Sequence, residues 1–282
     1  MALHLKSVLT MVILLTAAGA TGPAIAGAAT TAPSAPSTAG CHSLHASGKS
    51  DKQATTALAN YINTLREEGM TPDQVEAGLA STYCIVRIDH SDGTVSAASS
   101  VNSDVKSRPP TIDYDNQAHL YYAIAYWDWQ NTNFLDDGFN PFSPYTKNLG
   151  GTDGFAVTFN TGLLMSGWSA SWSGNGCHYG SGGTSTAATG DQYGAGFKFQ
   201  DQDYLNNCVG FNVYHGQEVI SFTHTQTKTC KSVQGFSNYG HSWSTTSLSG
   251  FSIGVYSIGF SWTSAGHDWA SQSQPGGVAT VC

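Results

Sequence analysis

The sequence predicts a mainly β protein, in which an antiparallel β-sandwich or barrel-like domain follows a small, disulfide-stapled helical hairpin. From Thr111 onward, apolar and polar residues alternate in short runs between Gly, Ser, Asn and Asp, as at Phe155, Val157 and Phe159. This period of two is typical of strands with one buried face. Between residues 51 and 83, apolar residues instead recur at helical spacing. Six cysteines, an even number, can form the disulfide staples.

The first 40 residues predict export from the cell. Residues 1–26 pass from the cation Lys6 through an apolar run to the small residues around Ala26. This order is that of a secretory signal peptide, and the apolar run is too short for a transmembrane anchor. Residues 27–40 contain only Gly, Ala, Thr, Ser and Pro, which predicts a disordered spacer. We therefore expect a secreted, extracellular protein without a transmembrane anchor.

The negative net charge of the chain argues against some classes of binding partner. It has 11 Lys and Arg against 19 Asp and Glu, a formal net charge of −8 at pH 7. Such an acidic chain neutralises few phosphates, which argues against binding of nucleic acid or of an anionic membrane surface. We expect the partner to be an extracellular glycan, a cation or another protein.

All six cysteines lie after the spacer, in the part of the chain that would be exported. No two of them have the C-x-x-C spacing of a zinc or redox site, so an oxidising compartment favours three disulfides. Spacing alone leaves several pairings open. We expect pairing in sequence order, as Cys41–Cys84, Cys177–Cys208 and Cys230–Cys282.

Residues 41–97 predict a small helical module with a short hairpin. An apolar face predicts a first helix of about 17 residues from Asp51. The stretch from Thr71 to Gln74 has the form of a capping box, which starts a second helix. The hairpin would follow over 85–97. The module would then either stay packed on the β domain or be a pro-segment that is removed by cleavage.

The all-β domain is expected over 111–282. Residues 98–110 are polar, end in Pro-Pro and predict a linker to that domain. Within the domain, the run at 251–262 changes its apolar phase at Val255-Tyr256. Because a strand cannot change face without an extra residue, we expect a β-bulge there or a strand buried on both faces.

The most aromatic stretch is HLYYAIAYWDWQN at 119–131. Its even positions form an ordinary core face, but its odd face places two alanines between Tyr121 and Trp127. If this face were exposed, the two alanines would form a shallow floor between the aromatic rings, and a flat ligand such as a sugar ring would stack there. In the alternative, the second sheet and the helices cover both faces and all five aromatics belong to the core. The ligand-binding residues predicted by the first interpretation are Tyr121, Trp127, Asp128, Trp129 and Asn131.

The loop after this strand, at 131–138, is rich in oxygen donors. No motif requires a cofactor, but calcium binds about six to eight oxygens, and the candidate ligands here are Asn133, Asp136 and Asp137. The loop lacks an EF-hand pattern, and residues that favour turns explain its composition as well.

No residue is predicted to be catalytic. Gly240-His-Ser242 begins like the G-x-S-x-G motif of α/β-hydrolases, but it lacks the last glycine and lies among strands. The sequence favours a non-enzymatic binding module for extracellular carbohydrate or another cell-envelope ligand. Two alternatives stay open. One is a secreted glycoside hydrolase with Asp128 and Asp137 as its carboxylate pair, and the other is a pore-forming β protein with amphipathic strands.

Overall fold

A computed structural model describes residues 40–46, 48–90, 104–131, 133, 147–176, 183–185, 189–204, 210–227 and 229–282. The chain divides into two compact units, Met1–Ala35 and Pro36–Cys282, and every element below belongs to the second. The predicted signal peptide and almost all of the predicted spacer lie outside the described residues. Within the described residues, no helix is both long enough and apolar enough to span a membrane.

Both predicted helices are present, α1 at Asp51–Glu67 and α2 at Pro72–Tyr83. The start of α2 is a capping box, because the Thr71 side chain accepts a hydrogen bond from the backbone N–H of Gln74, and the Gln74 side chain accepts one from the backbone N–H of Thr71. The start of α1 has the same arrangement. Gly69, with φ of 83°, turns the chain between the helices.

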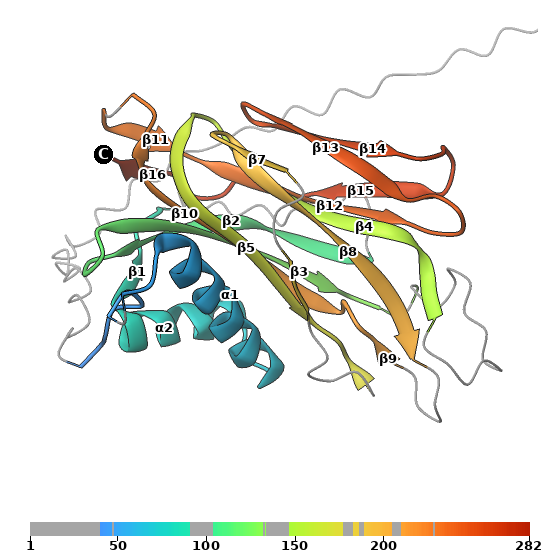
Figure 1. Cartoon of the computed structure of the whole chain (residues 1–282), viewed down its shortest axis with the longest axis horizontal. Coiled ribbons are helices and arrows are strands. Elements are labelled where there is room, and N and C mark those ends of the chain that lie inside the picture. Colours follow the sequence, from blue (N-terminus) through green and yellow to red (C-terminus); the bar gives the residue numbers. More distant parts are fainter. Residues whose placement is uncertain are drawn as a thin grey trace, which may run out of the picture. The chain divides into compact units, whose positions relative to one another are not determined.

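Two antiparallel sheets form the sandwich (Figure 1). The first has the order β1-β2-β3-β10-β5-β6, with strands at Ile85–Arg87, Val105–Asp115, Leu120–Trp129, His215–Thr225, Leu163–Ser173 and Gly183–Ser185. The second has the order β15-β12-β4-β8-β7, with strands at Asp268–Gln272, Gly235–Ser242, Lys147–Phe159, Gly194–Tyr204 and Thr189–Asp191, and with β9 (Gly210–Phe211) beside β8. Two separate pairs are β11 (Lys231–Val233) with β16 (Ala279–Val281), and β13 (Leu248–Gly254) with β14 (Ser257–Trp262).

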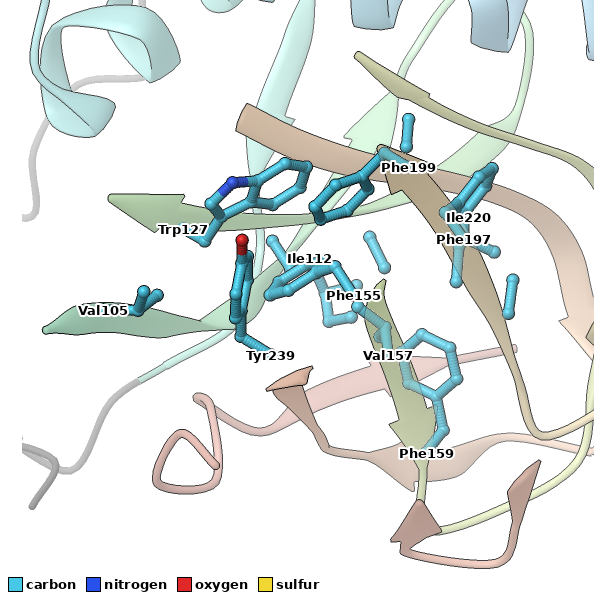
Figure 2. Close-up of a cluster of buried hydrophobic side chains, with 14 of the residues drawn as sticks. Val105, Ile112, Trp127, Phe155, Val157, Phe159, Phe197, Phe199, Ile220 and Tyr239 are labelled. Carbon is cyan, nitrogen blue, oxygen red and sulfur yellow. The ribbon is translucent and has the colours of Figure 1, made fainter. Parts of the chain in front are cut away.

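Aromatic and aliphatic side chains fill the space between the two sheets (Figure 2). Trp127 of β3 stacks on Phe199 of β8 with ring centroids 5.3 Å apart, and Phe155 of β4 packs on the same indole at 4.7 Å. The buried residues of β4 include Phe155, Val157 and Phe159, which reproduces the alternation in the sequence. The predicted fold class, mainly β with an antiparallel sandwich, is therefore confirmed.

The two helices cover the outer face of the first sheet (Figure 1). Leu58 and Ile62 of α1 are fully buried and form one apolar cluster with Tyr122 and Tyr126 of β3. The helical segment therefore shares its core with the sheet, and it belongs to the same compact unit as the sandwich.

The linker predicted at 98–110 is wrong from residue 105 onward, because β2 begins at Val105 and pairs with β1 and β3. Pro109 and Pro110 lie at a register shift between β2 and β3. Proline cannot donate to a strand ladder but is tolerated at such irregularities. The rest of the predicted linker and the turn of the predicted hairpin, at 91–103, lie outside the described residues.

Strands β13 and β14 form a hairpin over the outer face of the second sheet (Figure 1). The turn is Val255-Tyr256, with Tyr256 at φ 54° and Ile253 opposite Ile258. The bulge or doubly buried strand expected here is therefore wrong. The apolar phase changes because the chain reverses direction, and facing residues across a two-residue turn have opposite parity.

Glycines of the second sheet make room for this hairpin. A Cβ added to Gly196 of β8 would lie 2.9 Å from the Phe251 ring of β13, and one added to Gly240 of β12 would lie 2.9 Å from the Phe260 ring of β14. Both rings therefore rest directly on the backbone of the sheet. The hairpin adds a further β layer that the alternation in the sequence did not predict.

Two of the three predicted disulfides are confirmed, Cys41–Cys84 and Cys230–Cys282. The first joins the segment before α1 to the residue that ends α2. The second lies next to the paired strands β11 and β16. Cys177 and Cys208 lie outside the described residues.

One carboxyl group lies inside the sandwich without a hydrogen-bond partner among the described residues. Glu218 of β10 is fully buried, and neither carboxyl oxygen bonds to any described residue. Its neighbours on the adjoining strands are Ala125 of β3 and Ala170 of β5. Burial in these apolar surroundings raises the pKa of Glu218 well above the ordinary value, so the group stays protonated.

Replacing Glu218 should remove a pH-dependent loss of stability. The folded protein resists ionisation of this group, so the free energy of unfolding falls as the pH rises above about 4.3, the ordinary pKa of glutamate. We expect Glu218→Gln to match the wild type near pH 4 and to exceed its stability by at least about 1 kcal/mol at pH 7. Urea unfolding at several pH values measures this. Burial also raises the pKa of Asp113 to about 7, but this group changes the stability of the wild type and of the variant with pH by the same amount. If the stability of the two proteins changed with pH in parallel, that result would contradict a buried, neutral Glu218.

Candidate functional site

The strand predicted as a ligand platform is covered on both faces. Trp127 and Trp129 of β3 are 0% and 3% exposed inside the sandwich, and Tyr121 is half-buried and stacked on Phe222 at 5.4 Å. The alanines of this strand leave no open floor, because Phe155 of the second sheet packs on Trp127. The exposed platform is therefore absent. The alternative, in which both faces of the strand belong to the core, is confirmed.

The polar residues predicted beside that strand bind other side chains of the protein. Asp128 accepts hydrogen bonds from Arg66 and Arg108. The Asn131 side-chain amide donates to Asp104 at 2.6 Å. The other half of the predicted carboxylate pair, Asp137, lies outside the described residues.

The predicted calcium loop at 131–138 is described only in part. The Asn133 side-chain amide donates to the Asp104 carboxylate at 2.9 Å, and the Asn133 backbone N–H donates to the Asn131 side chain. Asp136 and Asp137 lie outside the described residues. Calcium binding by this loop therefore stays a prediction.

A second group of polar side chains lies inside the sandwich. Asp153 of β4, Asp201 of β8 and His241 of β12 come from strands that are neighbours in the second sheet. All three are buried, and one donor atom from each lies within 4.8 Å of the others. We call this group the buried triad.

The phase of each strand explains how the triad reaches the interior. Asp153 lies two residues before Phe155, and His241 lies two residues after Tyr239, so each shares the inward face of its strand. Asp201 extends the inward face of Phe199 in the same way. None of these three residues is predicted from the sequence, although each continues an apolar alternation by one step at the same end of the sheet.

Hydrogen bonds fix the central carboxylate of the triad. Asp153 Oδ2 accepts from the Tyr239 hydroxyl at 2.9 Å and from His241 Nδ1 at 2.8 Å. Asp153 Oδ1 accepts from the backbone N–H of Ser242 at 2.8 Å. Burial, followed by the charges of Asp153 and Asp201, raises the pKa of Tyr239 well above its ordinary value, so its hydroxyl remains a donor.

Aromatic rings connect the triad to the protein surface. The His241 ring contacts Trp129 at 5.2 Å and Trp269 at 5.1 Å, and it stacks on Trp243 at 5.9 Å. Trp243 and Trp269 are half-buried, and the exposed His267 meets Trp243 edge-on at 5.6 Å. The series His267, Trp243, His241 thus runs from solvent to the buried carboxylates.

The donors of the triad are suited to a transition metal. Two carboxylates and one imidazole nitrogen are a ligand set that Mn²⁺ or Zn²⁺ accepts, whereas Ca²⁺ prefers oxygen donors alone. The Asp153 carboxylate already accepts three protein hydrogen bonds. These bonds occupy three of the about four acceptor sites of the carboxylate, which favours a structural role for Asp153.

Comparison with protein-family models, curated proteins and solved structures finds no match to this chain.

Removing the hydroxyl of Tyr239 should destabilise the protein. Tyr239→Phe deletes a buried hydrogen bond to a carboxylate, so we expect the free energy of unfolding to fall by about 1.5–3 kcal/mol. The control is Tyr256→Phe, which deletes a hydrogen bond from a half-buried hydroxyl to the neutral side chain of Gln234 and should cost about 0.5–1.5 kcal/mol. Urea unfolding measures both variants. An equal loss of unfolding free energy in the two variants would contradict a stronger hydrogen bond from Tyr239 to the Asp153 carboxylate.

Proposed function

We propose that the protein is a secreted, non-enzymatic binding module for an extracellular carbohydrate or another cell-envelope ligand. The binding surface is formed by Trp243, Trp269 and His267, at the end of the sandwich above the buried triad. The observation that carries this proposal is the stacking of half-buried Trp243 on His241, because it holds an aromatic ring in place at the surface.

The chemistry of these residues suits a sugar. The apolar C–H face of a sugar ring packs on an aromatic face, and its hydroxyl groups bond to imidazole and amide groups at the rim. Trp243 is held from behind by His241 and at its edge by His267. A ring that is already fixed loses little conformational entropy when a ligand binds.

Secretion is supported by the disulfides. Cys41–Cys84 and Cys230–Cys282 are both formed, and stable disulfides are typical of proteins outside the cytosol. The order of residues in 1–26 agrees with this location, because it is that of a secretory signal peptide.

A glycoside hydrolase is the second candidate, because Asp153 and Asp201 have carboxylate oxygens within 4.8 Å of one another. Retaining glycosidases use carboxyl groups about 5–5.5 Å apart. Both aspartates are fully buried, however, and Asp153 accepts three hydrogen bonds from the protein. A glycosidic bond in solvent does not reach fully buried carboxylates, which favours binding over hydrolysis.

The test begins with a glycan array probed with the secreted protein and continues with a fluorescence titration of any glycan that binds. Trp243→Ala should weaken binding by at least about tenfold, the loss expected for an aromatic residue that is central to an interface. The control is Trp168→Ala, which removes a half-buried tryptophan from β5 of the other sheet. Equal affinities of W243A and wild type would exclude this surface, and release of reducing sugar from the bound glycan would favour the hydrolase.

A further inference from the structure

A second polar cluster lies on the outer face of the first sheet, where α1 ends. His215 of β10 is directly opposite Asp128 of β3 on one side and Ser173 of β5 on the other. The next residues on the same face of β10 and β5, Gln217 and Ser171, both donate to the backbone oxygen of Ala59 in α1. The alternation of strands therefore places His215 and Ser173 on the helix side of the sheet.

Two arginines reach this cluster from other elements. Arg66, in the last turn of α1, binds Asp128 Oδ1, and Arg108 of β2 binds Asp128 Oδ2 at 3.3 Å. They are two of only three arginines in the chain, and the exposed Lys106 lies opposite Asp128 on β2. Three cations therefore surround one carboxylate, which gives this point a positive charge in an otherwise acidic protein.

Several buried polar atoms of the cluster have no hydrogen-bond partner among the described residues. They are Arg66 Nε, His215 Nε2 and Ser173 Oγ. Ser173 is fully buried, and the Arg66 side chain is 9% exposed. A buried polar atom left unpaired costs about 1–3 kcal/mol, so three of them at one place indicate that water or a ligand bonds to them.

The side chains of the cluster differ in their exposure to solvent. Side-chain exposure increases from 9% at Arg66 through 16% at Asp128 to 36% at Arg108. Solvent therefore reaches this cluster at Arg108, whereas His215 is half-buried and Ser173 is fully buried.

We propose that Arg66, His215 and Ser173 form a binding site for a small oxyanion, either a free inorganic anion or the acidic group of a glycan. The guanidinium N–H, the imidazole N–H and the hydroxyl all donate to anion oxygens, and bonds from charged donors are the strongest of these. Asp128 holds the two guanidinium groups in position from the other side. This site lies across the first sheet from the triad and does not depend on the carbohydrate surface at Trp243.

The pH dependence of binding follows from the groups that face His215. These are Arg66 on α1, Lys106 and Arg108 on β2, and Asp128 on β3. Burial and then the charge of Arg66 lower the pKa of His215, and Asp128 opposes this change only in part. His215 is therefore neutral near pH 7, and its protonation as the pH falls adds a cation that tightens anion binding.

The experiment measures the melting temperature of the full secreted protein in millimolar sodium sulfate, sodium phosphate or sodium glucuronate, each balanced with NaCl to equal ionic strength. Glucose is the uncharged control. A bound anion raises the melting temperature along a saturating curve, whereas a general salting effect grows without saturating and is shared by all variants. Saturation with sulfate and phosphate identifies free inorganic anions, and saturation with glucuronate alone identifies the acid of a glycan. Either result supports the site.

Two variants locate the effect. Ser173→Ala and His215→Ala should each weaken the apparent affinity by about tenfold, and H215A should also lose the tightening of sulfate binding between pH 7 and pH 5. The control Arg87→Gln removes the third arginine, which pairs with Glu76 and Asp89, and should leave the curve unchanged. Absence of saturation with every anion in the wild type, or unchanged curves in both site variants, overturns the proposal.

Discussion

The burial of strand β3 on both of its faces is the constraint on which the rest of the structure depends. Its odd residues, such as Trp127, fill the space between the sheets, and its even residues, such as Tyr122 and Tyr126, are covered by the helices. The helices and the sandwich are therefore parts of one folding unit. A processing step that removed the helices would expose large buried aromatic rings, so the structure favours a helical segment that stays in place.

The same strand separates two polar clusters of opposite character. Inside the sandwich, Asp153 is held by a tyrosine, a histidine and a backbone N–H. On the outer face, Asp128 is held by two arginines. Both clusters lie where β3 ends, beyond the largest hydrophobic side chains. Because the apolar core needs fewer residues there, the ends of the strands can carry charged groups.

The sequence predicted the fold where local patterns decide it. The capping box of α2 and the alternation of β4 follow the prediction, because each depends on neighbours in the chain. The pairing of Cys41 with Cys84 agrees with the expected sequence order. The site was not readable in the same way. The aromatic residues of HLYYAIAYWDWQN belong to two hydrophobic cores, one on each face of the strand. Only the arrangement of the sheets and helices shows that neither face is exposed. The buried triad requires three strands to be aligned, which no single segment specifies.

The position of β10 has a consequence for the order of folding. It lies between β3 and β5 in the first sheet, and Ser221 of this strand accepts a hydrogen bond from Thr55 of α1, from which it is separated by 166 residues. The helix side of the sheet and the sandwich side are both incomplete until this strand docks. Contacts between such distant segments slow folding. In a chain made from its N-terminus, the apolar face of α1 therefore lacks its partner strand β10 until residues 215–225 have been made, so both cores are completed late.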